Sequence, residues 1–135
     1  MPDQPRQKKL VFLVDDDPDF LEIFGTKLSA AGFEMVPFQD PQAALEAVEP
    51  QQPDLILLDV QMPKLSGIQM MTALKANPRT AGIKVIFLTN SGTNEEGMAW
   101  LDQKFAKEVG AMGHIRKSDD LDAITARVIQ DLALQ

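Results

Sequence analysis

The sequence predicts an α/β protein built on a doubly wound, five-stranded parallel sheet with helices on both faces. Short apolar runs typical of buried strands alternate five times with longer segments of helical periodicity. Such alternation with short connections is typical of parallel strands joined by right-handed crossovers. The length of 135 residues favours one domain, and 44% hydrophobic with 24% charged residues is an ordinary composition for a folded chain.

Three apolar runs are predicted to be strands buried on both faces of the sheet, because they lack the polar alternation of a half-exposed strand. They are Leu10–Val14, Leu55–Leu58 and Val85–Leu88. Two weaker candidates complete the sheet, namely Glu34–Phe38 and Gly113–Arg116.

The first predicted helix has signals at both ends. Asp17 is expected to be its N-cap, Pro18 its first residue and Gly32 its end. An aspartate at such a position is more often a structural helix cap than a metal ligand, so we expect Asp17 to be a cap. The apolar face is predicted to consist of Phe20, Ile23, Phe24 and Leu28.

Four further helices are predicted at about Pro41–Val48, Ser66–Ala76, Asn94–Val109 and Asp119–Leu134. The helix at Ser66–Ala76 ends at Asn77-Pro78. The helix at Asp119–Leu134 carries an apolar face of Leu121, Ile124, Val128 and Leu132. Residues 1–8 are expected to form a polar tail, and residues 9–135 a single domain with no second domain after it.

Composition excludes several classes of function. The absence of cysteine excludes disulfide scaffolds and thiolate metal sites, and it fits a cytoplasmic protein. A single histidine, His114, excludes most zinc sites. The net charge of −7 argues against direct nucleic-acid binding. No apolar run is long enough to span a membrane, so membrane insertion is not expected.

Polar residues follow the predicted strands, where ligands bind in an open α/β sheet. Asp15 and Asp16 follow the first strand, Asp59 the third, Thr89 the fourth and Lys117 the fifth. Clustered carboxylates without His or Cys favour a hard cation, Mg²⁺ first and Mn²⁺ as an alternative. The lysine and threonine are typical phosphate partners, so the set predicts a metal-assisted phosphoryl site, in which an Asp can be the acceptor.

Four segments resemble the receiver domain of two-component response regulators, in its chemotaxis-type single-domain form. They are LVDDDP (Leu13–Pro18), DLILLDVQMPKLSG (Asp54–Gly67), VIFLTN (Val85–Asn90) and GAMGHIRKS (Gly110–Ser118). The resemblance covers nearly the whole chain and implies the flavodoxin-like strand order 2-1-3-4-5.

The resemblance also implies a role for each site residue. Asp59 would be the phosphorylated aspartate, and Thr89 and His114 would be switch residues. Lys117 would pair with the phosphoryl group. The Mg²⁺ ligands would be Asp15, Asp16, Asp59 and the backbone carbonyl of Gln61. The protein would not be an enzyme beyond promoting its own phosphorylation and dephosphorylation.

The implied partners are a sensor histidine kinase or a histidine phosphotransfer protein and a downstream protein target. The target would bind the face formed by the fourth helix, fifth strand and fifth helix, and a homodimer is an alternative use of that face. Trp100 lies on the polar side of the predicted fourth helix with Lys104 and Lys107, so we expect it to contact a partner or to fold over the preceding loop.

Other readings of the acidic motifs fit less well. A phosphohydrolase of the haloacid dehalogenase type needs a D-x-D-x-T/V pattern, but Asp17 is followed by Pro18-Asp19. An EF-hand needs Gly at position six and Glu at position twelve, where the chain has Phe20 and Thr26. A P-loop lacks its Lys-Ser/Thr. A pseudo-receiver that only binds, or an N-terminal fragment of a longer regulator, remains an alternative.

Overall fold

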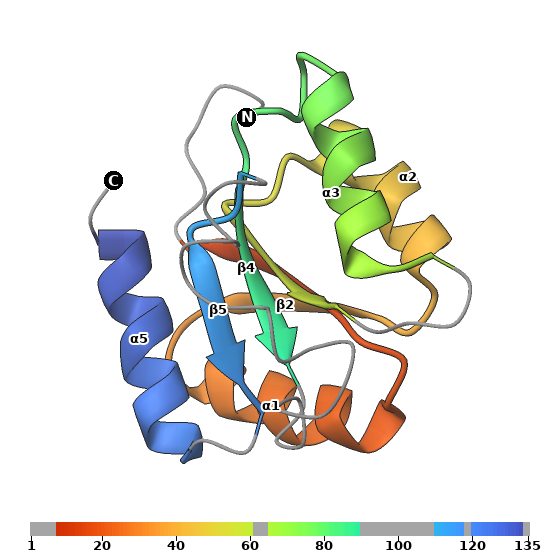
Figure 1. Cartoon of the computed structure of the whole chain (residues 1–135). Coiled ribbons are helices and arrows are strands. Elements are labelled where there is room, and N and C mark those ends of the chain that lie inside the picture. The colour runs from red at the N-terminus through yellow and green to blue at the C-terminus, as the bar shows by residue number, and fades with distance from the viewer. Residues whose placement is uncertain (1–7, 61–64, 90–109, 118–119, 134–135) are drawn as a thin grey trace.

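A computed structural model describes residues 8–60, 65–89, 110–117 and 120–133 of the chain. These residues form a five-stranded, all-parallel sheet in the order β2-β1-β3-β4-β5, as predicted (Figure 1). The strands are β1 (Leu10–Val14), β2 (Glu34–Phe38), β3 (Leu55–Asp59), β4 (Lys84–Thr89) and β5 (Gly113–Arg116). The helices are α1 (Pro18–Ala30), α2 (Pro41–Gln51), α3 (Gly67–Ala76) and α5 (Leu121–Ala133).

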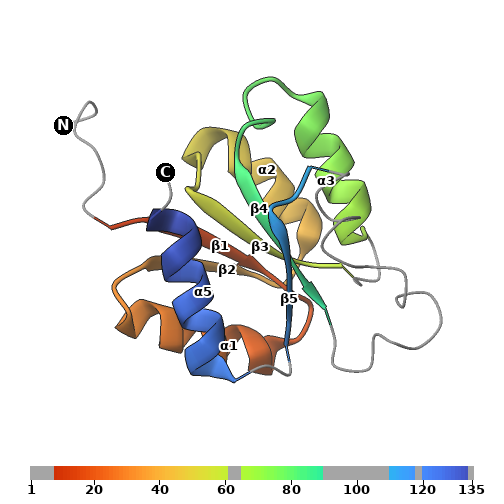
Figure 2. The same cartoon turned by 60° about the vertical axis from the view of Figure 1, so that its left-hand side comes forward.

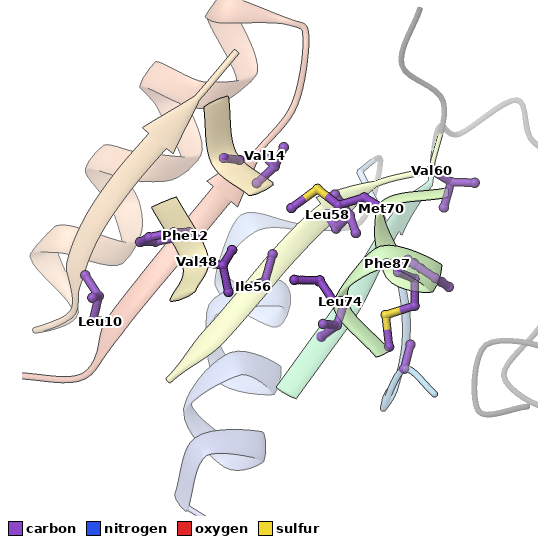
Figure 3. Close-up of a cluster of buried hydrophobic side chains, with 14 residues drawn as sticks. Leu10, Phe12, Val14, Val48, Ile56, Leu58, Val60, Met70, Leu74 and Phe87 are labelled. Atoms are coloured by element: carbon purple, nitrogen blue, oxygen red, sulfur yellow. The ribbon is translucent and has the colours of Figure 1, made fainter. Parts of the chain in front are cut away.

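Helices cover both faces of the sheet, with α1 and α5 on one face and α2 and α3 on the other (Figure 2). Successive residues of a strand point to opposite faces, so each buried strand contributes to two hydrophobic clusters. Phe12, Ile56 and Phe87 pack beneath α2 and α3 (Figure 3). Their neighbours Leu13 and Leu57 pack with α1 and α5. Burial on both faces explains why these strands are apolar throughout.

Helix α1 begins and ends where the sequence predicts. Asp17 Oδ1 accepts hydrogen bonds from the backbone N–H of Asp19 (3.0 Å) and of Phe20 (3.4 Å). Gly32 closes the helix with a left-handed φ of 105°. Its N–H donates to Ser29 O, which satisfies a carbonyl of the last turn.

The predicted apolar face of α1 is wrong at one position. Ile23 is 56% exposed, whereas Leu21, Phe24 and Leu28 are buried. Leu21 and Ile23 lie about 200° apart around the helix, at about 100° per residue. Both continue an apolar stripe through Phe24, so only the rotation of α1 against the sheet distinguishes them.

Some element boundaries also differ from the prediction. Helix α2 continues past Val48 to Gln51, with Pro50 in its last turn. Proline removes a single helical hydrogen bond there, and Gln52 (φ 50°) closes the helix by donating its N–H to Val48 O. Helix α3 begins at Gly67, since Ser66 is its N-cap rather than its first residue.

Parts of the predicted architecture fall outside the described residues. These are the fourth helix at Asn94–Val109, most of the N-terminal tail and both predicted ends of the last helix, Asp119 and Leu134. Among the helices that are described, none is long and apolar enough to cross a membrane.

Candidate functional site

The chemistry-bearing residues converge at the carboxyl edge of the sheet, the edge toward which the arrowheads of β4 and β5 point in Figure 1. Asp15 follows β1 directly, and Asp59 is the last residue of β3. Thr89 ends β4, and Lys117 follows β5, with its N–H donating to Thr89 O at 2.7 Å. Four residues from four distant parts of the sequence therefore lie on neighbouring strands.

An ammonium group bridges two carboxylates at this edge. Lys117 Nζ lies 2.6 Å from Asp15 Oδ2 and 3.3 Å from Asp59 Oδ2. Asp15 is fully buried, Asp59 is 2% exposed, and the Lys117 side chain is 13% exposed. An ion pair with so little access to water is screened far less than a surface pair.

Three carboxylates form a cluster that suits a divalent cation. Asp15, Asp16 and Asp59 each offer an oxygen, and these atoms lie within 4.8 Å of one another. All the donors are hard oxygens, which favours Mg²⁺ or Mn²⁺ over softer metals. Asp16 is exposed, so the cluster is open to solvent on one side and leaves room for water ligands. The residues present therefore fit the predicted metal.

Burial and charge act against each other on the two titratable groups at the centre. Burial raises the pKa of Asp15 above its ordinary 3.8, although Lys117 and the N–H of Asp17 act to lower it. For Lys117, burial lowers the pKa, but the hydrogen bond to Asp15 and the charge of Asp59 outweigh this and hold the pKa above 10.5. The ammonium therefore stays charged throughout the neutral range.

The raised pKa of Asp15 predicts a pH dependence of stability. Between pH 3.8 and the raised value, the folded protein binds more protons than the unfolded chain, so stability falls as the pH rises through this window and stays reduced above it. We expect the unfolding free energy of the metal-free protein to fall relative to that of Asp15→Asn across the window. Urea denaturation in EDTA at a series of pH values measures this difference. A difference that does not change with pH would contradict the prediction.

The structure supports the structural role predicted for Asp17. Its side chain caps α1, and its backbone N–H donates to Asp15 Oδ1 at 2.9 Å. The first acidic residue is thus held by the third. Thr89 is buried, and its hydroxyl donates to Ile115 O at 3.5 Å, while His114 is half-buried on β5.

Gly67 allows α3 to approach the end of β3. A Cβ added at Gly67 would lie 2.6 Å from Asp59 O and 2.9 Å from Val60 Cα, both backbone atoms that cannot move aside cheaply. The N–H of Gly67 also donates to Val60 O at 3.0 Å. Only glycine therefore fits beside the predicted phosphoacceptor.

We expect Gly67→Ala to lower the unfolding free energy by roughly 1–3 kcal/mol through this overpacking. The matched control is Gly25→Ala in α1, where nothing lies within 4 Å of the added Cβ. Alanine in a helix should there stabilise by roughly 0.5–1 kcal/mol. Urea denaturation of both variants makes the comparison, and equal effects would remove the steric argument.

Several predicted site residues lie outside the described part of the chain, namely Gln61, Trp100, Lys104 and Lys107.

Two contacts at the site were missed by sequence reasoning. The Phe20 ring lies beneath Lys117 Nζ, 5.1 Å from its centroid, and Gln39 Nε2 donates to Asp16 O at 3.4 Å. Both join residues that are distant in sequence, so no local signal could have found them.

The family model of the response regulator receiver domain matches residues 11–129 of the chain. Among curated proteins, the chain is 32% identical over 120 residues to the phosphate regulon transcriptional regulatory protein PhoB of Pseudomonas aeruginosa. It is 32% identical over 126 residues to the DNA-binding response regulator MtrA of Mycolicibacterium smegmatis. The matches cover 89% and 93% of this chain but 50% of each relative, so the chain spans half the length of these proteins.

Solved structures share the fold over almost the whole chain. A response regulator from Desulfuromonas acetoxidans has a TM-score of 0.77 at 28% identity, with 93% of this chain and 98% of the other covered. The chemotaxis response regulator CheY4 of Vibrio cholerae has a TM-score of 0.77 at 23% identity, with 93% and 99% covered. At 23% identity, the likeness to the Vibrio cholerae protein shows a shared fold and nothing more.

Proposed function

Because the chain belongs to the response regulator receiver domain family, we propose that it is a phosphoacceptor switch of two-component signalling in which Asp59 receives the phosphoryl group. The observation that carries the proposal is the environment of the Asp59 side chain, which combines burial, a nearby ammonium and two neighbouring carboxylates. Its side chain is 3% exposed, lies 3.3 Å from the Lys117 ammonium and shares a cluster with two further carboxylates. An aspartate used only as a turn residue would need neither the burial nor the cation.

In the proposed reaction, an oxygen of Asp59 attacks the phosphorus of a phosphoryl donor. The bond from phosphorus to the donor atom breaks, and the product is an aspartyl phosphate. Lys117, already beside Asp59, would pair with the phosphoryl oxygens as a point charge. Thr89, at the end of the neighbouring strand, would turn its hydroxyl toward the same group.

Asp15, Asp16 and Asp59 would hold Mg²⁺, with the backbone carbonyl of Gln61 as a further ligand outside the described residues. A bound Mg²⁺ would offset the negative charge that the carboxylates and the phosphoryl oxygens bring together. Asp15 would need to share its position between the cation and Lys117, whose ammonium lies 2.6 Å from its Oδ2.

The proposed donor is a histidine kinase or a histidine phosphotransfer protein in the cytoplasm. The switch would act on a downstream protein through β5, α5 and the predicted fourth helix, whose Trp100, Lys104 and Lys107 lie outside the described residues. His114, half-buried on β5, is the proposed second switch residue on this face. A second copy of the chain is the alternative occupant.

Intact-protein mass spectrometry after incubation with acetyl phosphate and Mg²⁺ tests the proposal. We expect a gain of one phosphoryl group that hydroxylamine removes, because an acyl phosphate is a reactive mixed anhydride. The same incubation in EDTA should give no gain. A protein that stays unmodified with Mg²⁺ present would favour a pseudo-receiver that binds partners without the chemistry.

A further inference from the structure

We propose that Phe20 is a positioning residue for Lys117, holding the ammonium over Asp59 through a cation–π contact. The proposal rests on the function proposed above for Lys117. Lys117 Nζ lies over the Phe20 ring at 5.1 Å from its centroid, within the roughly 6 Å range of this interaction. The ammonium thus has carboxylates on one side and an aromatic face on another.

One contact positions the ring of Phe20, and a second positions its backbone. Phe20 packs against Phe24 with ring centroids 5.2 Å apart and an interplanar angle of 44°. Phe24 is fully buried in the cluster beneath α1 and α5. The backbone N–H of Phe20 also bonds the Asp17 cap at 3.4 Å. The ring therefore packs against a buried neighbour, and its backbone belongs to the capped first turn of α1.

The same short loop connects the ring to the ion pair. Asp15 contacts Lys117 through Oδ2 at 2.6 Å and accepts the N–H of Asp17 through Oδ1 at 2.9 Å. Asp17 then caps the helix turn that carries Phe20. The acidic loop therefore contacts the ammonium directly through Asp15 and also caps the helix turn that carries the ring.

The contact has a consequence for phosphorylation. A lysine side chain has four rotatable carbon–carbon bonds, and two carboxylates fix only its charged end. An aromatic face beneath the ammonium restricts the remaining positions without competing for its hydrogen bonds. The N–H donors of Lys117 thus stay available to incoming phosphoryl oxygens, which a third carboxylate would not allow.

Phe20→Leu should slow phosphorylation by acetyl phosphate about three- to tenfold, the range expected for losing a partly desolvated cation–π contact. The affinity for Mg²⁺, measured by titration, should change less than about twofold, because the ring contacts the ammonium and not the carboxylates. The matched control is Phe33→Leu. Phe33 is a partly buried phenylalanine on the same cluster. Within the described part of the chain, the ammonium of Lys117 lies over Phe20 and not over Phe33, so this substitution should leave the rate unchanged.

A fluorinated series separates the cation–π effect from shape. Replacing Phe20 by mono-, di- and trifluorophenylalanine weakens the ring quadrupole stepwise with little change in size. The logarithm of the phosphorylation rate should fall steadily with the number of fluorines. A phosphorylation rate that does not change with the number of fluorines on the ring would overturn the role of Phe20.

A spectroscopic measurement keeps this proposal separable from the proposed function. In NMR spectra, the ε-methylene protons of Lys117 should be shifted upfield by the ring and should move to ordinary values in Phe20→Leu. If wild-type protein takes up no phosphoryl group, the proposed function fails while this shift still reports the contact. An unshifted Lys117 in wild type would overturn the contact itself.

Discussion

Asp59→Asn is expected to abolish phosphorylation by acetyl phosphate while leaving the fold intact. The amide is nearly the same size as the carboxylate but is a poor nucleophile, so no acyl phosphate can form at this position. Asp59 is the last residue of β3 and is 2% exposed. The other four residues of this strand are Leu or Ile, so β3 holds no second carboxylate that could replace it. The measurement is intact-protein mass after incubation with acetyl phosphate and Mg²⁺.

Two comparisons make this result interpretable. Cooperative urea unfolding of Asp59→Asn would establish that loss of labelling is not loss of structure. Asp54→Asn is the matched variant, since Asp54 lies just before the other end of the same strand, where its Oδ2 accepts the N–H of Leu10 at 2.7 Å. Asp54→Asn should label as wild type does. Full labelling of Asp59→Asn would place the acceptor elsewhere.

Lys117→Ala is expected to cost about 3 kcal/mol of stability in the metal-free protein, because it removes the cation beside two buried carboxylates. The same change should keep Mg²⁺ binding but impair the response to beryllofluoride, a mimic of the phosphoryl group. Added Mg²⁺ should recover much of the lost stability, since it supplies positive charge to the same carboxylates. Urea denaturation with and without Mg²⁺ and fluorine NMR of beryllofluoride measure these effects.

Lys27→Ala is the matched control for charge removal. Lys27 pairs with Asp122 across α1 and α5, but their side chains are 40% and 75% exposed. A pair so open to water is strongly screened, so its loss should be far less costly than that of Lys117. Added Mg²⁺ should not restore the stability that is lost in Lys27→Ala.

An unchanged beryllofluoride response in Lys117→Ala would remove Lys117 from the switching mechanism.

The order and type of the described elements could be read from the sequence because their signals are local. The apolar run of β1, the Asp17 cap and the glycine after α1 each act within a few residues, and each appears as predicted. The weaker patterns of β2 and β5 instead reflect the place of these strands in the sheet. Each is an edge strand with one neighbour, so fewer of its residues need to be apolar.

The place of the candidate site in the fold could also be predicted from the sequence. Parallel strands bring their carboxyl ends to one edge, so polar residues that follow separate strands must meet there. Asp15, Asp59, Thr89 and Lys117 do meet at that edge. The pattern of strand ends was therefore sufficient to assemble the candidate site without knowledge of any distance.

Only the tertiary structure decided which way side chains face and which of them touch. Leu21 and Ile23 satisfy the helical pattern equally well, and the packing of α1 against the sheet buries the first and exposes the second. Likewise, Phe20 and Lys117 are far apart in sequence, and neither residue's neighbours indicate that one lies over the other. Such contacts depend on the rotation and spacing of whole elements, which are set by the summed packing of the core and not by any local pattern.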